Sequence, residues 1–149
     1  MILFCYMSQN QLFIKILRDS NYSATKARLF VFDLLLKATG PQTMHQLIEA
    51  SKGIIDRVSV YRVIELYEKL GIAQRINIGW KYKIELSDIF LEHHHHMTCL
   101  GCGRVIAVKD DPAFEAMINR LGETHGFVLK QHQLEMQGYC DRCGQGHVS

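Results

Sequence analysis

The stretch LEHHHHMTCLGCG, residues 91–103, places four consecutive histidines directly ahead of a Cys-x-x-Cys pair. A purification tag normally stands at a terminus and has no reason to run into a cysteine pair, so we interpret this run as a metal-binding element. A second pair follows in CDRC, residues 140–143, and Cys5 stands alone. The run and the two pairs organise the second half of the chain.

Two Cys-x-x-Cys pairs supply the four thiolates of a tetrahedral zinc site. The expected ligands are Cys99, Cys102, Cys140 and Cys143. The 37 residues between the pairs can hold a strand, a helix and a returning strand. Gly103 and Gly144, which follow the pairs, suit turns with an unusual φ. A redox couple is the alternative, but two matched pairs favour metal.

The histidine run has a physical rationale if it is extended, because successive side chains of a strand point to opposite faces. His94 and His96 then project one way, and His93 and His95 the other. The run can therefore serve two metal sites, each of which needs further ligands. Candidates are Glu115 and His132, which stand among apolar residues where an unpaired polar group is costly.

The first half reads as three helices followed by a β-hairpin. SATKARLFVFDLLLKATG is capped by Thr25 and ends near Gly40, with Leu29, Phe32, Leu35 and Leu36 as its apolar stripe. TMHQLIEASKG is capped by Thr43, and RVSVYRVIELYEKLG closes at Gly71. IAQRI and KYKIEL form the hairpin. This order is typical of a winged helix-turn-helix, although a three-helix core with no DNA-binding role would look similar.

The charge differs between the halves. Residues 1–86 hold 12 Lys and Arg against 7 Asp and Glu, whereas residues 87–149 hold 5 against 8. A basic first half suits a polyanion such as DNA. No apolar run approaches the ~20 residues that span a bilayer, and MILFCYM lacks the basic flank and cleavage site of a signal peptide. We therefore expect a cytoplasmic protein.

The second half is predicted to be strand, helix and strand. RVIAV reads as a buried strand, and a helix begins at Asp111-Pro112 and runs to about His125. FVLKQHQLEMQGYC reads as one long strand with His132 in its middle. A unit of about 60 residues normally needs a metal or a partner subunit for stability.

These segments together resemble the ferric uptake regulator family of metal-sensing repressors, from about Tyr22 to Cys143. SVYRVIELYEKLGIAQRI (59–76) is similar to its recognition helix, HHHHMTCLGCGRVI (93–106) to its hinge and first zinc pair, and THGFVLKQHQLEMQGYCDRC (124–143) to its closing strand and second pair. The resemblance implies an α+β fold. A winged helix-turn-helix domain, residues 1–86, would join a small α/β dimerisation domain with structural zinc, residues 87–149. The implied assembly is a homodimer on operator DNA.

Carried over by position, the resemblance implies three metal sites and a DNA-binding surface. The four paired cysteines would hold structural zinc, and Glu85, His94 and His96 would form the sensing site. His93, His95, Glu115 and His132 would form an additional site. The DNA-binding residues would be Arg28, Ser59, Tyr61 and Arg62.

The chain departs from the family pattern in three places. The family's hinge histidine corresponds to Pro41 or Gln42, and His45 is the nearest replacement. Ser23 stands where a basic residue is usual, and His95 where a carboxylate is common.

We expect a repressor in which regulatory Fe²⁺ fixes the angle between the domains and so favours DNA binding. Zn²⁺ and Mn²⁺ suit similar ligands, so a zinc uptake regulator and a peroxide-sensing relative are the alternatives. A metalloenzyme is disfavoured because the chain lacks His-Glu-x-x-His and deaminase signatures. A metal buffer would not need the basic winged helix.

Overall fold

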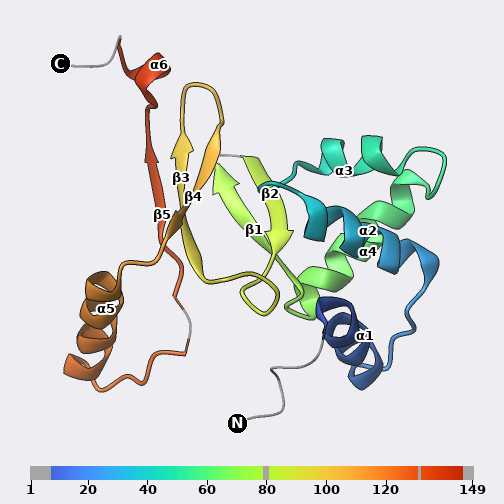
Figure 1. Cartoon of the computed structure of the whole chain (residues 1–149), viewed down its shortest axis with the longest axis horizontal. Helices are drawn as coiled ribbons and strands as arrows, with labels where there is room; N and C mark the ends of the chain where they lie inside the picture. Colours follow the sequence, from blue (N-terminus) through green and yellow to red (C-terminus); the bar gives the residue numbers. More distant parts are fainter. Residues whose placement is uncertain (1–7, 79–80, 131, 146–149) are drawn as a thin grey trace. The chain divides into compact units, whose positions relative to one another are not determined.

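The computed structural model describes residues 8–78, 81–130 and 132–145. The chain divides into two compact units (Figure 1). The first comprises Met1–Ile76 and Tyr82–Leu91, and the second comprises Asn77–Lys81 and Glu92–Ser149. Cys5 lies outside the described residues. No described helix is both long enough and apolar enough to cross a membrane.

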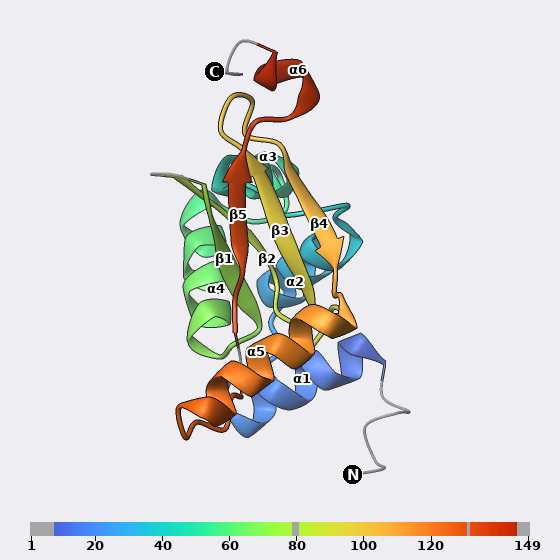
Figure 2. The same cartoon turned by 90° about the vertical axis from the view of Figure 1, so that its left-hand side faces the viewer.

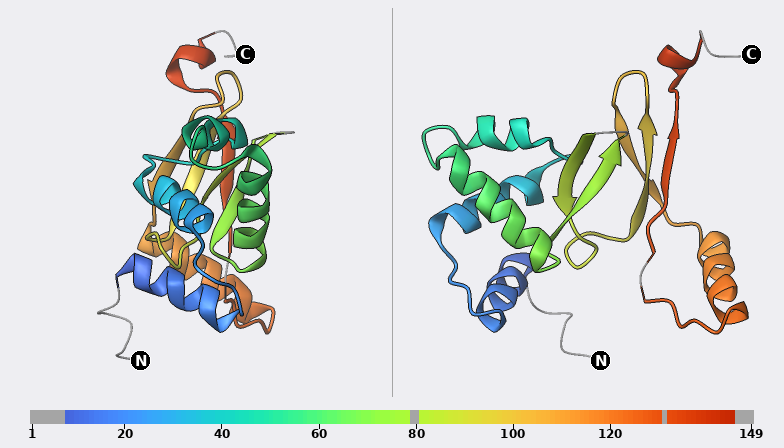
Figure 3. Two further views of the ribbon diagram at one scale, coloured as in Figure 1. Left: turned by 90° about the vertical axis from the view of Figure 1, so that its right-hand side faces the viewer. Right: turned by 180° about the vertical axis from the view of Figure 1, so that it is seen from behind.

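Among its described residues, the first unit contains four helices and most of a two-stranded sheet (Figure 3, right). The adjoining strand ends, Asn77, Ile78 and Lys81, belong to the second unit. The elements are α1 (Gln9–Asp19), α2 (Lys26–Lys37), α3 (Met44–Ser51), α4 (Arg57–Lys69), β1 (Ala73–Ile78) and β2 (Lys81–Leu86). Thr25 and Thr43 accept hydrogen bonds from the third backbone amides of α2 and α3, as their sequences predict. Gly71, at φ +69, follows α4. The predicted end of α2 at Gly40 is wrong, because its last residue is Lys37.

Helix α1 was not expected from the sequence, although its signals are present. Ser8 and Gln11 form a reciprocal capping box at its start. Phe13 is fully buried, stacks on Phe32 with ring centroids 4.1 Å apart and meets the edge of Tyr67. The core of the unit therefore depends on α1 as well as on the three predicted helices. Leu29, predicted to face this core, is instead 39% exposed.

The second unit is built on a three-stranded sheet with the order β4–β3–β5 (Figure 2). Its elements are β3 (His94–Cys99), β4 (Val105–Lys109), α5 (Pro112–Thr124), β5 (Glu135–Gly138) and α6 (Asp141–Gly144). β3 pairs antiparallel with β4 and parallel with β5. Asp111 caps α5, which has Pro112 in its first turn, as predicted. α5 lies beyond one end of the sheet and α6 beyond the other (Figure 1).

Two predictions about this unit are wrong. Of the described residues in the segment predicted as one long strand, only the four of β5 form a strand, and His132 precedes it. β3 begins at His94, so residues far upstream of β5 have no neighbouring strand to pair with. β4 forms as expected but is not buried, since Ile106 is 45% exposed. The α+β class is confirmed.

Candidate metal centres and nucleic-acid interface

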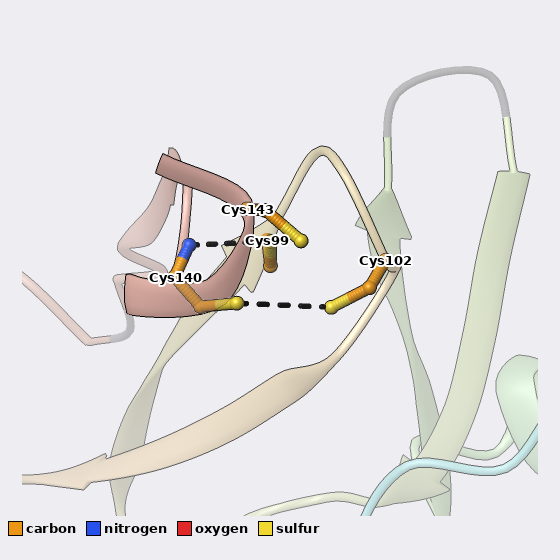
Figure 4. Close-up of side chains that lie close together, drawn as sticks. All are labelled: Cys99, Cys102, Cys140 and Cys143. Atoms are coloured by element: carbon orange, nitrogen blue, oxygen red, sulfur yellow. Dashed lines mark hydrogen bonds between the residues drawn. The ribbon is translucent and has the colours of Figure 1, made fainter. Parts of the chain in front are cut away.

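The four paired cysteines converge at the end of the sheet near α6 (Figure 4). In the first pair, Cys99 ends β3 and Cys102 lies in the turn that follows. In the second pair, Cys140 immediately precedes α6 and Cys143 lies within it. All four Sγ atoms lie within 4.8 Å of one another, and Cys102 Sγ is 4.0 Å from Cys140 Sγ. Tetrahedral zinc with Zn–S bonds of ~2.3 Å would separate its sulfurs by ~3.8 Å. The cluster therefore fits a zinc ion with little adjustment.

Hydrogen bonds prepare these thiols unequally for metal binding. The backbone N–H of Cys140 donates to Cys99 Sγ at 3.3 Å, and this contact contributes most to lowering the Cys99 pKa to about 6. A backbone hydrogen bond from Cys143 likewise lowers the pKa of Cys140. Hydrogen bonding of its thiol to Cys140 raises the pKa of Cys143 to about 12. Without metal, one corner of the cluster thus favours a thiolate and another retains its proton.

Glycines shape the turns of this cluster. Gly103 has φ +69, as its place after the first pair predicts, whereas Gly144 is helical and has no positive φ. The prediction of an unusual φ at Gly144 is therefore wrong. Gly101 is required for a different reason, because a Cβ there would lie 2.8 Å from the Cβ and 2.9 Å from the Sγ of Cys143. No spacing in the sequence indicates this close approach.

His93, His95, Glu115 and His132 form a second cluster within the second unit. Glu115 Oε1 lies 3.1 Å from His132 Nε2 and 3.3 Å from His95 Nε2. His93 Nε2 is 3.3 Å from His132 Nε2. Ligands at ~2.0–2.2 Å from a tetrahedral metal would stand ~3.4 Å apart. Three segments, namely the histidine run, α5 and the chain before β5, thus bring four donor atoms to the spacing of a coordination sphere.

Several buried polar atoms in this cluster have no hydrogen-bond partner among the described residues. They are both ring nitrogens of His95, Glu115 Oε1 and Asp110 Oδ1. His95 is only 4% exposed, so water does not solvate its ring freely. Buried polar groups are normally satisfied, and a shared cation would satisfy these. Asp110 was not expected from the sequence. Its Oδ1 lies 3.4 Å from His95 Nε2.

His94 and His96 project from the opposite face of the run, as strand alternation predicts. Their ring centroids are 4.7 Å apart, and those of His93 and His95 are 5.1 Å apart. Glu85 belongs to β2 of the first unit, where it accepts a hydrogen bond from Gln74 Nε2 at 2.9 Å. The joining of Glu85 to the two histidines stays a prediction.

The structure gives no support for His45 as a replacement ligand. His45 lies on α3 with an 83% exposed side chain, 4.0 Å from Glu49. It belongs to none of the potential metal-binding clusters among the described residues. Gln42, one of the two residues that correspond to the family's hinge histidine, pairs through its backbone with Ile84. That position therefore lies beside the strand that carries Glu85.

Helix α4 carries most of the predicted DNA-binding residues. Tyr61 and Arg62 are exposed on it, and Arg57 lies over the Tyr61 ring at 5.7 Å from its centroid. The Ser59 hydroxyl donates to Asp56 at 2.6 Å, so it stabilises the start of the helix. This hydrogen bond also lowers the pKa of Asp56.

Arg28 lies on α2 and is held by two neighbours. Its guanidinium donates to the Ser23 carbonyl at 2.6 Å and stands over the Tyr22 ring. Its own carbonyl accepts a hydrogen bond from the Tyr67 hydroxyl, which anchors α2 to α4. The arginine is thus partly ordered at the surface before any ligand binds.

Comparison with known proteins identifies relatives over most of the chain. The profile described as the ferric uptake regulator family matches residues 19–137. The ferric uptake regulation protein of Bordetella parapertussis is 30% identical over 135 residues, which cover 87% of this chain and 95% of that protein. The ferric uptake regulation protein of Escherichia coli K12 is 33% identical over 133 residues, covering 83% and 85%.

Solved structures of ferric uptake regulators also resemble this chain. The Vibrio cholerae ferric uptake regulator aligns with a TM-score of 0.69 at 26% identity, covering 85% of this chain and 98% of that one. The Helicobacter pylori ferric uptake regulator shares the fold, with a TM-score of 0.76 at 22% identity and 93% coverage of both chains. On the family match and these relatives, the chain belongs to the ferric uptake regulator family of metal-responsive regulators.

Proposed function

We propose that this protein is a metal-dependent repressor of metal-uptake genes that binds operator DNA as a homodimer. The observation that carries the proposal is the division of the histidine run. One face of the run meets Glu115 and His132 inside the second unit, and the other face leaves His94 and His96 for a separate site. A buffer protein would not need this division, because binding capacity alone requires no second site of different composition.

DNA binding is assigned to the winged-helix domain, residues 1–86. α4 presents Tyr61 and Arg62 to solvent, and Arg28 is held at the surface of α2. Arginine can bind guanine edges or phosphates, and the tyrosine ring can contact a thymine methyl group. Ser59 keeps the helix start ordered by capping with Asp56. The basic balance of this half supports a polyanionic partner.

Dimerisation is assigned to residues 87–149. The buried apolar core cluster lies entirely in the first unit, whereas the second exposes large apolar side chains. They include Ile106, Met117, Leu121, Phe127, Val128 and Tyr139. Val128 is 80% and Phe127 is 66% exposed. Surfaces of this kind mark subunit interfaces, and a two-fold dimer would present two α4 helices to successive major grooves.

Metal control is assigned to Glu85, His94 and His96. Glu85 would join the two histidines as ligands of one divalent cation and so restrict the angle between the domains. A bound cation supplies only charge and geometry here. Restricting the angle favours the arrangement that fits DNA, and linkage of this kind is typically worth about 1–3 kcal/mol. In the absence of metal, the same domains would sample arrangements that do not fit the operator.

Fe²⁺ is the proposed regulatory metal. Imidazole and carboxylate donors suit Fe²⁺, and the relatives of at least 30% identity are ferric uptake regulation proteins. Zinc sensing is the second candidate because three imidazoles converge at the His93 cluster and also suit Zn²⁺. Comparison of Fe²⁺, Mn²⁺ and Zn²⁺ in the same DNA-binding titration separates the two.

The test is fluorescence anisotropy under anaerobic conditions with duplexes selected by the protein from a random pool. We expect Fe²⁺ to raise the affinity by about 5–150-fold over chelator, and the His94→Ala variant to lose this dependence. His125→Ala, on the exposed end of α5, is the matched control and should keep it. Equal affinity in chelator and in metal would contradict the proposal.

The assignment of α4 has its own control. Arg62→Ala should weaken operator binding by about 1–3 kcal/mol, since it removes one contact to a base or a phosphate. Arg18→Ala removes the same charge from the exposed end of α1 and should have little effect. If the two variants weaken binding equally, the basic charge acts diffusely and α4 is not the reading helix.

A further inference from the structure

A further carboxylate oxygen lies beside the cluster of His93, His95, Glu115 and His132. Asp110 Oδ1 lies 3.4 Å from His95 Nε2 and 3.8 Å from His93 Nε2. Both separations are shorter than the 4.8 Å within which the four donor atoms of the cluster lie. The Asp110 side chain is 30% exposed, but its Oδ1 atom is buried and accepts no hydrogen bond from the described residues.

The strand pairing explains why Asp110 is there. β3 and β4 run antiparallel with His94 opposite Lys109 and His95 opposite Val108. Continuing this register by one residue places Asp110 opposite His93, immediately after β4 ends. Residues that face each other in an antiparallel pair project to the same side of the sheet. Asp110 therefore shares a face with His93 and His95.

The neighbouring aspartate has a different task. Asp111 accepts a hydrogen bond from the Ala113 amide at 2.8 Å and caps α5. Its carboxylate thereby satisfies a backbone donor, as helix caps do. Asp110 has no such task among the described residues. The two adjacent aspartates thus have different roles: Asp111 caps the helix, and Asp110 has a buried oxygen close to the imidazoles.

We propose that the Asp110 carboxylate is a fifth ligand of this metal site. This proposal rests on the metal site formed by His93, His95, Glu115 and His132, and adds one ligand to it. Three neutral imidazoles with Glu115 alone would carry one negative charge against a divalent cation. Adding Asp110 balances the charge in a partly buried place, where an unbalanced charge is costly. The resulting set has three nitrogen and two oxygen donors.

A five-donor set alters which metals the site favours. Structural zinc is almost always four-coordinate and tetrahedral. Carboxylate-rich sets of higher coordination number suit Mn²⁺ and, with imidazole, Fe²⁺. Asp110 would therefore act as a specificity-determining residue that shifts this site away from zinc. Asp110 directly follows the end of β4 and belongs neither to the histidine run nor to α5.

The test uses Co²⁺ as a spectroscopic probe in the full-length protein with its structural zinc in place. His94→Ala/His96→Ala is the background, so that Co²⁺ can enter only the His93 cluster. Four-coordinate Co²⁺ absorbs visible light more strongly than five-coordinate Co²⁺. Asp110→Asn keeps the shape of the side chain, and we expect it to weaken Co²⁺ binding about tenfold or more and to strengthen the visible absorption per bound ion.

Two controls make the outcome decisive. Asp111→Asn can still cap α5 and is expected to match the background in Co²⁺ affinity and spectrum. His132→Ala should lose the Co²⁺ signal. An unchanged spectrum and affinity in Asp110→Asn, with the signal lost in His132→Ala, would overturn the role of Asp110 alone. An unchanged signal in His132→Ala would overturn the site itself, and neither result depends on DNA binding. Unchanged far-ultraviolet circular dichroism verifies that each variant is folded.

Discussion

The backbone amide of Cys140 donates to the sulfur of Cys99 at 3.3 Å, joining residues 41 positions apart. This contact closes the loop that contains β4, α5 and β5, and it favours the Cys99 thiolate at neutral pH. The second unit has little apolar core of its own, since Cys99 is its only buried apolar side chain among the described residues. Its stability should therefore depend strongly on what the four sulfurs bind.

Replacing Cys140 with serine should release the structural zinc and unfold the second unit. The variant loses one of four ligands and places a poor donor beside Cys102. We expect zinc content, measured by mass spectrometry of the intact protein, to fall from one ion per chain toward none. Cys5→Ser is the matched control and should retain zinc. Retention of a full zinc equivalent by Cys140→Ser would contradict the four-thiolate site.

Substituting Gly101 with alanine should weaken the same site without removing a ligand. The new Cβ would meet the Cys143 side chain at 2.8–2.9 Å, so the sulfur must move. Overpacking of this kind typically costs about 1–3 kcal/mol. Zinc transfer to a chromogenic chelator should be faster than in Gly138→Ala, whose Cβ meets no atom within 4 Å. Equal transfer from both variants would show that the turn adapts freely.

Because Tyr67 is buried, we expect the protein to lose stability in alkaline solution. Tyr67 is fully buried, and burial raises the pKa of its hydroxyl. In the unfolded chain a tyrosine ionises near pH 10. Above that pH the folded state retains the proton that the unfolded state loses, so stability is complete below about pH 10 and falls as the pH rises further.

The corresponding variant is Tyr67→Phe. We expect it to be about 1 kcal/mol less stable at pH 7, because the Arg28 carbonyl loses its hydrogen-bond donor. Above pH 10 its stability should fall less steeply than that of the unmutated protein, by up to about 1.4 kcal/mol per pH unit. Urea unfolding followed by circular dichroism at several pH values measures both slopes. Identical alkaline slopes would show that Tyr67 ionises at the same pH in the folded and unfolded states.

Phe13 should be essential to the first unit. Truncation to alanine removes a ring that is fully buried against Phe32 and Tyr67, and such changes cost about 3–5 kcal/mol. Ile89→Ala, at a side chain that is 53% exposed, should stay within about 0.5 kcal/mol of the unmutated protein. Urea unfolding monitored by helical circular dichroism compares them. A small loss for Phe13→Ala would mean that α1 docks only weakly.

The parts of the molecule that the sequence predicted well are those with local signals. Thr25 and Thr43 mark helix starts through side-chain caps, and the short spacing of each cysteine pair brings its two sulfurs close together. α1 was overlooked despite the capping box formed by Ser8 and Gln11. Its signal was as local as the others and could have been found.

The parts that could not be predicted depend on contacts between distant segments. Asp110 reaches the histidines only because β4 pairs with β3 in one register, and no motif spacing contains that information. The close approach of Gly101 to Cys143 likewise requires the second pair to fold back on the first. The alternating pattern around His132 suggested a strand, but a strand forms only where a neighbour is available.

The identical side chains at positions 93–96 have a consequence for folding. If β3 were shifted by one residue relative to its neighbours, two imidazoles would still face each side of the sheet, so the histidines do not distinguish the two registers. Thr98 and Cys99 do distinguish them, because both are buried and only Cys99 carries a thiol. Zinc binding by the cysteines would therefore select the correct register of β3 and place each histidine on its proper face of the sheet.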